Sequence, residues 1–345
     1  MARVGDALRE AQVAAVYLAH GTFVGADALG ILTELARVYP AAGHAVRRVS
    51  KQVVDSVAGD AGNYTPRYAR TFEKGINRRG ARHIPVRLFQ WSSQNNHIGR
   101  ADGAVRLAAE LISQEFAPSE RVLLWGHSHA GNVFALLSNL LAADAQLRDE
   151  FFRAARVYYR WPLFGCVDIP IWRKVRMQLD RTPGPLAQTP LDVVTFGTPI
   201  RYGWDSAGYS RLLHFVNHKP TEGLPEYQAP FPPTVEGVLS AADGDYVQQL
   251  GIAGTNIMPS LFACRSWLAD HRLNDMLQAN LARRELVDRL KLGVRVPDEG
   301  TTLLVNYGPV EGNVAHHIAG HAIYTRSQWL LFHAEEVARR FYQAA

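Results

Sequence analysis

The chain has few cysteines and no long apolar run, and both absences limit what it can be. Its 345 residues include two cysteines, Cys166 and Cys264, which make no disulfide framework and no metal knuckle. No stretch reaches the ~18 uninterrupted apolar residues that a membrane-spanning helix needs. The start, MARVGDALREAQ, lacks the basic head, apolar core and cleavage site of a signal peptide. We therefore expect no transmembrane segment and a cytoplasmic location.

A large excess of one charge sign is also lacking, because the formal net charge is only +5 and the cations form no single stripe. A solvated surface without a nucleic-acid partner is the simplest interpretation. Segment 158–176, YYRWPLFGCVDIPIWRKVR, mixes aromatic residues with Arg and Lys. It suits contact with anionic lipid or RNA, but a half-buried cap element is the preferred interpretation. No P-loop and no Gly-x-Gly-x-x-Gly follows the first strand, so we expect no nucleotide and no other cofactor.

What the chain does contain is a series of apolar runs of strand length. They span residues 13–18, 85–91, 121–125, 192–196, 212–217 and 302–307. The runs are near-continuous rather than alternating, as in strands that helices cover on both faces. Helical stripes lie between them, for example over 133–141, and another closes the chain over 330–341. The pattern predicts an α/β fold with a mostly parallel central sheet and helices on both faces.

Two regions break this alternation. Residues 151–190 carry Pro, Gly and aromatics without a clean period, and residues 222–300 hold a Pro-rich stretch followed by a helical pattern over about 267–292. Inserts beyond the carboxyl ends of strands usually shape a pocket. We therefore predict one domain over 1–345 with two cap or lid insertions.

The sharpest signal is the hexapeptide GHSHAG at residues 126–131, between an apolar strand and a striped helix. A serine on such a turn takes a strained backbone conformation that lifts its hydroxyl clear of the sheet. The close passage of strand and helix requires small neighbours, which Gly126, Ala130 and Gly131 provide. The start of the helix then faces the reacting centre with free N–H groups. Ser128 is the predicted nucleophile, and the alternative is a chance Gly-x-Ser between two elements.

With these residues the chain resembles the α/β-hydrolase superfamily, and within it the esterases and lipases. Ala130 stands where the family usually has the last glycine of Gly-x-Ser-x-Gly. The resemblance covers roughly residues 13–141, 191–225 and 320–342, and it leaves out both inserts. It implies an acyl-enzyme on Ser128 and a small-molecule or lipid-like ester substrate. The apolar residues of the two inserts favour a substrate with an apolar acyl group. Amide or thioester cleavage, acyl transfer and non-catalytic binding remain open.

The resemblance also implies two donors for the oxyanion of acyl transfer. One is the backbone N–H of His129, the residue after the nucleophile. The other comes from a loop after an early strand, often His-Gly-x, which matches His20-Gly21-Thr22. Thr22 would donate its backbone N–H, and Gly21 would let the loop approach closely. An ordinary strand-to-helix turn is the alternative for this tripeptide.

The base should be a histidine that follows the last strand, because the family orders its residues Ser, acid, His. His321 lies in that place, before the terminal helix, and His316 and His317 are the reserves. His317 and His321 are four apart, which also suits a metal pair. Gly320 and the absent glutamate argue against a zinc-protease helix, so we expect no metal.

The acid is harder to assign. It should follow the strand at 212–217, within HKPTEGLPEY, but Pro220 falls where a carboxylate is expected. Glu222 is the nearest substitute and our first choice, and Asp245 is the second. Asp205 and Glu311 come next. For each of these carboxylates, an exposed loop charge or a helix cap is a competing interpretation.

A further polar cluster, WSSQNNHIGRADG, follows the strand at 85–91. Asn96, His97 and Arg100 either line the pocket or serve the start of a helix. Asp102 is predicted to cap that helix.

Overall fold

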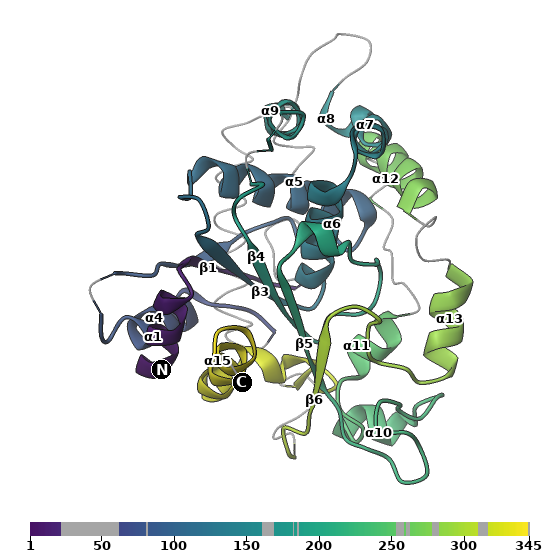
Figure 1. Cartoon of the computed structure of the whole chain (residues 1–345). Helices are drawn as coiled ribbons and strands as arrows, with labels where there is room; N and C mark the ends of the chain where they lie inside the picture. The colour runs from purple at the N-terminus through teal and green to yellow at the C-terminus, as the bar shows by residue number, and fades with distance from the viewer. Residues whose placement is uncertain are drawn as a thin grey trace.

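The computed structural model describes residues 1–21, 62–80, 82–160, 169–181, 183–184, 186–252, 259, 263–277, 283–309 and 317–343. Within these residues, six strands form one sheet in the order β2-β1-β3-β4-β5-β6, and every neighbouring pair is parallel (Figure 1). The strands are β1 (Val13–Ala19), β2 (Val86–Phe89), β3 (Arg121–His127), β4 (Leu191–Phe196), β5 (Arg211–Asn217) and β6 (Thr301–Val305). All six strands predicted from apolar runs are confirmed.

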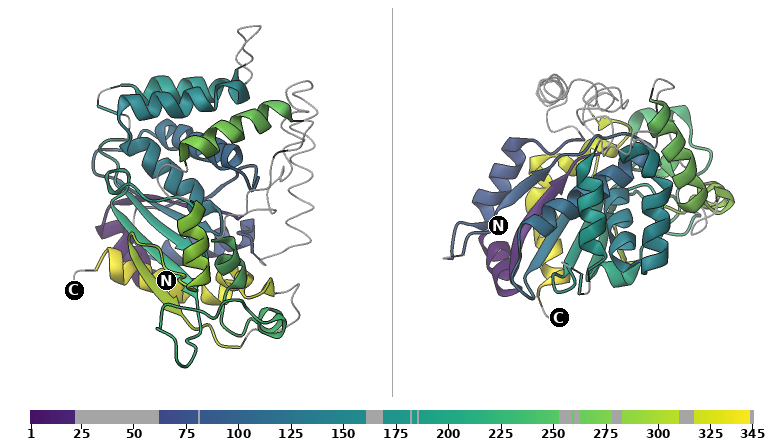
Figure 2. Two further views of the ribbon diagram at one scale, coloured as in Figure 1. Left: turned by 90° about the vertical axis from the view of Figure 1, so that its right-hand side faces the viewer. Right: turned by 90° about the horizontal axis from the view of Figure 1, so that it is seen from above.

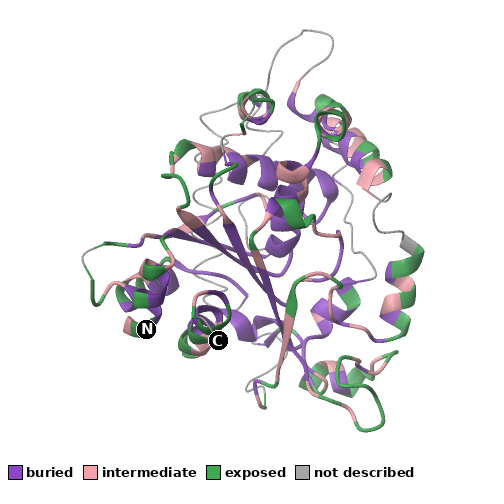
Figure 3. Cartoon of the chain, in the orientation of Figure 1, coloured by how far each residue is buried: buried purple, intermediate pink, exposed green. Residues whose placement is uncertain are grey.

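Helices cover both faces of this sheet. One face carries α5 (His97–Ser113) and α6 (Ala130–Ala142), and the other carries α1 (Ala2–Glu10), α4 (Pro66–Ile76) and α15 (Leu330–Phe341). Successive strand residues point to opposite faces of the sheet. Leu124 of β3 therefore packs into the apolar core on the face of α5 and α6, and Trp125 packs into the core on the face of α1, α4 and α15. This double burial explains the near-continuous apolar runs (Figure 3). The predicted stripes at 133–141 and 330–341 correspond to α6 and α15.

A further helix layer packs on the outer side of α5 and α6 (Figure 2). It contains α7 (Ala145–Ala154), α8 (Arg156–Tyr159), α9 (Pro170–Leu179) and α12 (Cys264–Leu277). Trp172 of α9 is fully buried among aromatic rings, and its indole N–H donates to Asp102 of α5 at 2.7 Å. The described part of segment 151–190 is therefore helical and anchored to α5, although its sequence shows no clean period.

The second insert contains α10 (Val235–Ser240), α11 (Tyr246–Gly251), α12 and α13 (Arg283–Lys291). The helix predicted over 267–292 corresponds to α12 and α13, and residues 278–282 between them lie outside the described residues. Three short 3-10 turns complete the described elements: η1 (Ser206–Gly208), η2 (His321–Thr325) and η3 (Ser327–Trp329). A cap or lid role for either insert stays a prediction. Across the described ranges, no helix has both the length and the apolar character to cross a bilayer.

The strand order creates one switch point in the sheet. From β1 the chain passes to β2 on one side and then to β3 on the other, so the loops after β1 and β3 diverge. Ligands of open α/β sheets bind in the crevice that such diverging loops leave at the carboxyl ends of the strands. His20 and Gly21 follow β1 there, and Ser128 follows β3. The fold thus brings two of the predicted motifs to one place.

Candidate active site

Ser128 joins β3 to α6 with a backbone φ of 55°. A residue other than glycine in this region is strained and persists only where its surroundings hold it. Two contacts with the end of β4 do so. The Ser128 N–H donates to the Phe196 carbonyl at 2.8 Å, and the Thr198 hydroxyl donates to the Ser128 carbonyl at 2.7 Å. The turn is therefore fixed from the neighbouring strand as well as from its own chain.

The small residues around Ser128 lie where β3 and α6 pass close to each other. A Cβ added to Gly126 would lie 2.5 Å from the Phe134 ring of α6, and one added to Gly131 would lie 2.2 Å from the Thr198 hydroxyl oxygen. Ala130 is fully buried at the start of α6. Strand and helix thus pass as closely as the elbow requires.

The loop after β1 lies directly against the nucleophile. A Cβ added to Gly21 would stand 2.7 Å from the Ser128 Cβ and 3.2 Å from its Oγ. The Trp91 indole N–H donates to the His20 carbonyl at 2.8 Å, and the Ser93 hydroxyl donates to the Gly21 carbonyl at 2.7 Å. Thr22, the predicted oxyanion donor of this loop, lies outside the described residues.

His129, the second predicted oxyanion donor, is the N-cap residue of α6. Within the described part of the chain, its backbone N–H makes no hydrogen bond. Its imidazole is buried and accepts from the Asn132 amide at 3.1 Å. Burial and then the charge of Arg100 hold the pKa of His129 well below its usual value, so its ring stays neutral.

His321 lies at the start of η2, after β6, and it pairs with Asp245. The ring Nδ1 donates to the Asp245 Oδ2 at 2.7 Å, and both side chains are buried. The other ring nitrogen, Nε2, is buried and has no hydrogen-bond partner among the described residues. An imidazole that donates through Nδ1 can accept a proton through its other ring nitrogen.

Contacts of the residues flanking Ser128 place His321 beside the elbow. The His127 ring lies 4.5 Å from the His321 ring between centroids, and the His127 Nε2 donates to the His321 carbonyl at 3.0 Å. Burial and then the charge of His321 lower the pKa of His127 to about 3. His321 therefore contacts the residue that precedes the predicted nucleophile, Ser128.

Asp245 is held by three donors. Besides His321, the Tyr324 hydroxyl donates to Oδ2 at 2.9 Å, and the Gln248 N–H donates to Oδ1 at 2.9 Å. Burial alone would raise the pKa of Asp245, but His321, the Gln248 N–H and the charge of Arg295 outweigh it and keep the pKa below its usual value. The carboxylate is therefore ionised at neutral pH although it is fully buried.

Asn217, the last residue of β5, ties the Asp245 loop to the His321 loop. Its backbone N–H donates to the Tyr324 hydroxyl at 2.7 Å and its side-chain amide donates to the Gly320 carbonyl at 3.0 Å. Its carbonyl accepts from the Asp245 N–H at 2.9 Å. Sequence reasoning missed Asn217, Tyr324 and Thr198. A polar residue that ends an otherwise apolar strand is the signal that would have indicated Asn217.

This geometry favours the second choice of acid over the first. Glu222 is exposed in the turn after β5, and the side-chain partner of His321 is Asp245, the second choice. The chain leaves β5 for the surface and returns to pair again, with Gly244 opposite His218, so the returning segment supplies the carboxylate. Asp205 is exposed and caps η1, and Glu311 lies outside the described residues.

The reserve histidines and the metal alternative can also be placed. His317 is buried, and its Nδ1 accepts from the Gly320 N–H at 3.3 Å, while His316 lies outside the described residues. In the ranges that the structure describes, no group of three or more His, Cys, Asp or Glu side chains is arranged to hold a metal ion.

The polar cluster after β2 contributes to the surroundings of His129. Arg100 is fully buried and donates to the Tyr202 hydroxyl at 3.0 Å, and its charge acts on His129. Asp102 does not cap α5, contrary to the prediction. The helix begins earlier, where the Asn96 side chain accepts from the Gly99 N–H at 2.8 Å, and Asp102 pairs with Arg106 one turn along α5.

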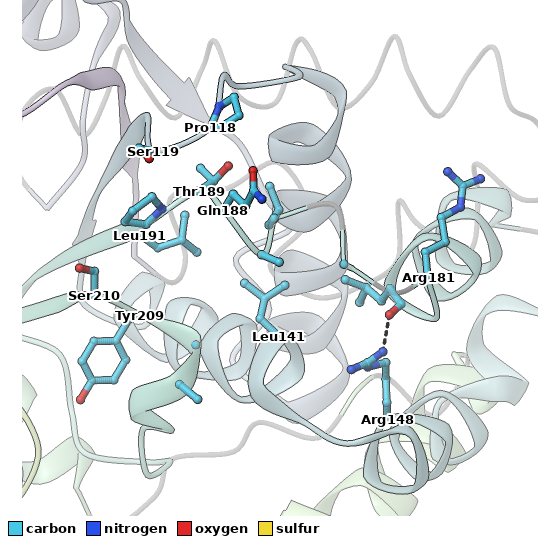
Figure 4. A pocket seen from close by; sticks show the side chains of 17 residues that line it. Pro118, Ser119, Leu141, Arg148, Arg181, Gln188, Thr189, Leu191, Tyr209 and Ser210 are labelled. Atoms are coloured by element: carbon cyan, nitrogen blue, oxygen red, sulfur yellow. Dashed lines mark hydrogen bonds between the residues drawn. The ribbon is translucent and has the colours of Figure 1, made fainter.

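A cavity of about 890 Å³ lies at the opposite end of the sheet (Figure 4). It is lined by Ser119, Pro190 and Ser210, which precede β3, β4 and β5. Ser128 follows the other end of β3, so roughly 20 Å of strand separates this cavity from the elbow. The cavity is no part of the candidate site.

No protein-family model, no curated protein and no solved structure matches this chain. The α/β fold with its parallel sheet therefore rests on the arrangement of the strands and helices themselves. What the elbow and its neighbours do has to be argued from their chemistry alone.

Proposed function

We propose that the protein is a serine hydrolase of the α/β-hydrolase type that cleaves carboxylic esters. Ser128 is the nucleophile, His321 the base and Asp245 the acid. One observation carries the proposal: His321 bonds a buried carboxylate through Nδ1 and leaves Nε2 without a partner among the described residues, while its ring packs against His127, the residue before a strained serine. A serine hydroxyl is a weak nucleophile unless such an imidazole takes its proton.

The order of the three residues supports this assignment. Ser128 follows β3, Asp245 follows β5 and His321 follows β6, and the α/β-hydrolases have the same chain order of serine, acid and histidine. His20-Gly21 passes against Ser128 at the place where that superfamily takes one oxyanion donor. The backbone N–H groups of His129 and Thr22 would hold the oxyanion.

In the first step, His321 Nε2 takes the Ser128 proton as Oγ attacks the ester carbonyl. The tetrahedral intermediate collapses when the imidazolium returns this proton to the leaving alkoxide, which departs as the alcohol and leaves an acyl-Ser128. In the second step, His321 deprotonates a water molecule that attacks the acyl carbon. The bond between the acyl carbon and Ser128 Oγ then breaks, the imidazolium returns its proton to Oγ, and the carboxylic acid is released. Asp245 stays ionised throughout and stabilises the imidazolium. The chemistry is complete without a cofactor.

The substrate class that we propose is a small-molecule or lipid-like ester. The inserts at 151–190 and 222–300 are rich in Leu, Phe, Trp and Pro, which favours an apolar acyl group. Turnover of p-nitrophenyl esters of increasing chain length measures this preference.

Labelling with a fluorophosphonate probe tests the proposal, because the probe reacts with activated serines. We expect mass spectrometry to find the label on Ser128, and we expect Ser128→Ala to abolish labelling. Ser138→Ala is the matched control: this serine is also buried in α6, but its hydroxyl donates to the Ala135 carbonyl. Folded protein that neither takes the label nor consumes ester would instead favour a ligand-binding function on the same fold.

A further inference from the structure

The outer helix layer contains a cavity of about 440 Å³ that the proposed hydrolysis does not use. It opens between α7, α8 and α9, at the top of the molecule in Figure 1, with the helices α5 and α6 between it and the sheet. Five arginines line it: Arg153, Arg156, Arg160, Arg173 and Arg176. We call this site the arginine cavity.

Two carboxylates, those of Asp149 and Asp180, accompany the five guanidiniums. Asp149 is bonded by both Arg153 and Arg176, so one carboxylate is shared by two cations. The nearest cation to Asp180 is Arg148, which lies 3.9 Å away and does not line the cavity. Because arginine stays protonated at any ordinary pH, the cavity carries a net positive charge.

The charges of three of the guanidiniums act on one buried side chain of the cavity, that of Tyr159. Tyr159 is buried at the cavity, which raises the pKa of its phenol, and the charges of Arg176, Arg156 and Arg160 all oppose that rise. Arg160 in addition holds a buried Nε that has no hydrogen-bond partner within the described ranges. Buried donors are nearly always paired in folded proteins, and a bound anion would supply the acceptor that the described residues do not.

We propose that the arginine cavity binds a phosphate-bearing anion, supplied by a free phosphorylated compound or by a lipid headgroup. Guanidinium groups match phosphate oxygens in geometry and form charge-assisted hydrogen bonds to them. A volume of about 440 Å³ falls within the range of small-ligand sites. Scattered surface arginines would give neither a concave lining of this volume nor a buried donor without a partner among the described residues.

Calorimetric titration of the full chain with inorganic pyrophosphate tests the site. The double variant Arg156→Gln/Arg173→Gln removes two exposed cavity arginines that make no ion pair among the described residues. We expect saturable one-site binding that this variant weakens by about tenfold or more. The control, Arg67→Gln/Arg70→Gln, loses the same charge from exposed positions on α4, on the other face of the sheet, and should bind as the parent does. Absent saturation, or equal weakening in both variants, overturns the proposal.

Cosedimentation with vesicles distinguishes the two sources of phosphate. Vesicles of phosphatidylcholine containing phosphatidic acid are compared with vesicles of phosphatidylcholine alone. Binding that requires phosphatidic acid and fails in Arg156→Gln/Arg173→Gln, but not in the control, supports a lipid headgroup. Pyrophosphate binding without vesicle binding supports a free phosphorylated compound. Vesicle binding that both double variants reduce equally, with no saturable pyrophosphate binding, means attraction by net charge and contradicts the site.

Discussion

The two ends of the parallel sheet differ in how their polar groups are used. At the carboxyl ends, three loops bring buried side chains together, and Asp245 receives a hydrogen bond from His321, Tyr324 and Gln248. At the amino ends, an open cavity of about 890 Å³ is lined by the loops before the strands and by parts of neighbouring helices (Figure 4). Its Arg148 donates to the Leu179 and Ala143 carbonyls and so serves to cap helix ends.

The candidate active site is thus distinguished by several buried polar side chains that meet at one place, and not by the volume of a cavity. Parallel strands send their loops outward from the carboxyl ends, where the neighbouring helix N-termini offer free N–H groups. Ser128 and His129 stand at such a helix start. The amino-end cavity contains no pair of acid and histidine among its lining residues.

Among the variants that test the polar groups at the carboxyl ends, Asp245→Asn is expected to have the largest effect on turnover. An amide can still cap α11, as Asn is a good N-cap residue, but it no longer stabilises an imidazolium. We expect turnover of a p-nitrophenyl ester to fall by about 10⁴-fold with the fold retained. Steady-state kinetics, with circular dichroism as the check on folding, measures this.

Glu222→Gln is the matched control, since it removes the same charge from the exposed carboxylate nearest to β5 in the sequence. We expect turnover to stay within about twofold of the parent. A large loss in Glu222→Gln together with a small loss in Asp245→Asn would reverse the assignment of the acid.

A smaller effect is expected from Tyr324→Phe, which tests Tyr324 as a positioning residue. The change removes one donor to Asp245 and leaves the buried N–H of Asn217 without its acceptor. The free energy of unfolding should fall by about 1–3 kcal/mol, and kcat should fall by about tenfold. Urea denaturation and ester kinetics measure the two changes.

Tyr307→Phe separates positioning from simple support of the fold. Tyr307 is also buried, but its hydroxyl bonds the His333 Nε2 at 2.7 Å and does not contact Asp245. It should lose stability while keeping kcat within about twofold. An equal drop of kcat in both tyrosine variants would mean that Tyr324 acts only through stability.

The sequence predicted the framework because each of its signals is local. The apolar runs gave the strands, and the small residues around Ser128 indicated a close strand–helix passage that Phe134 and Thr198 now explain. These features depend on residues that are near one another in the chain. His321 was chosen in another way, from the order of serine, acid and histidine in the superfamily that the chain resembles, and its role as the base stays a prediction.

The acid and the start of α5 were not predictable because both depend on contacts between distant segments. Asp245 is at once the cap of α11 and the partner of His321, and its local pattern indicates only the cap. It reaches His321 because Asn217 bonds the returning segment. Asp102 likewise looked like a cap, but Arg106 and Trp172, the latter from a distant helix, hold it inside α5.

The smallest effect is expected from a substitution in the amino-end cavity. This substitution tests most directly whether the two ends of the sheet act independently. Gln188 is exposed in the cavity, and among the described residues its one hydrogen bond is that of its carbonyl, which accepts from the Ser119 N–H. Gln188→Trp should therefore fill the space without disturbing that bond. Ser128 lies at the other end of β3, roughly 20 Å away. Fluorophosphonate labelling and ester turnover should therefore stay within about twofold of the parent and of Gln188→Ala. A drop of about tenfold in Gln188→Trp alone, at unchanged stability, would show that the two ends of the sheet are coupled, and volume at the amino ends would then matter to the candidate site.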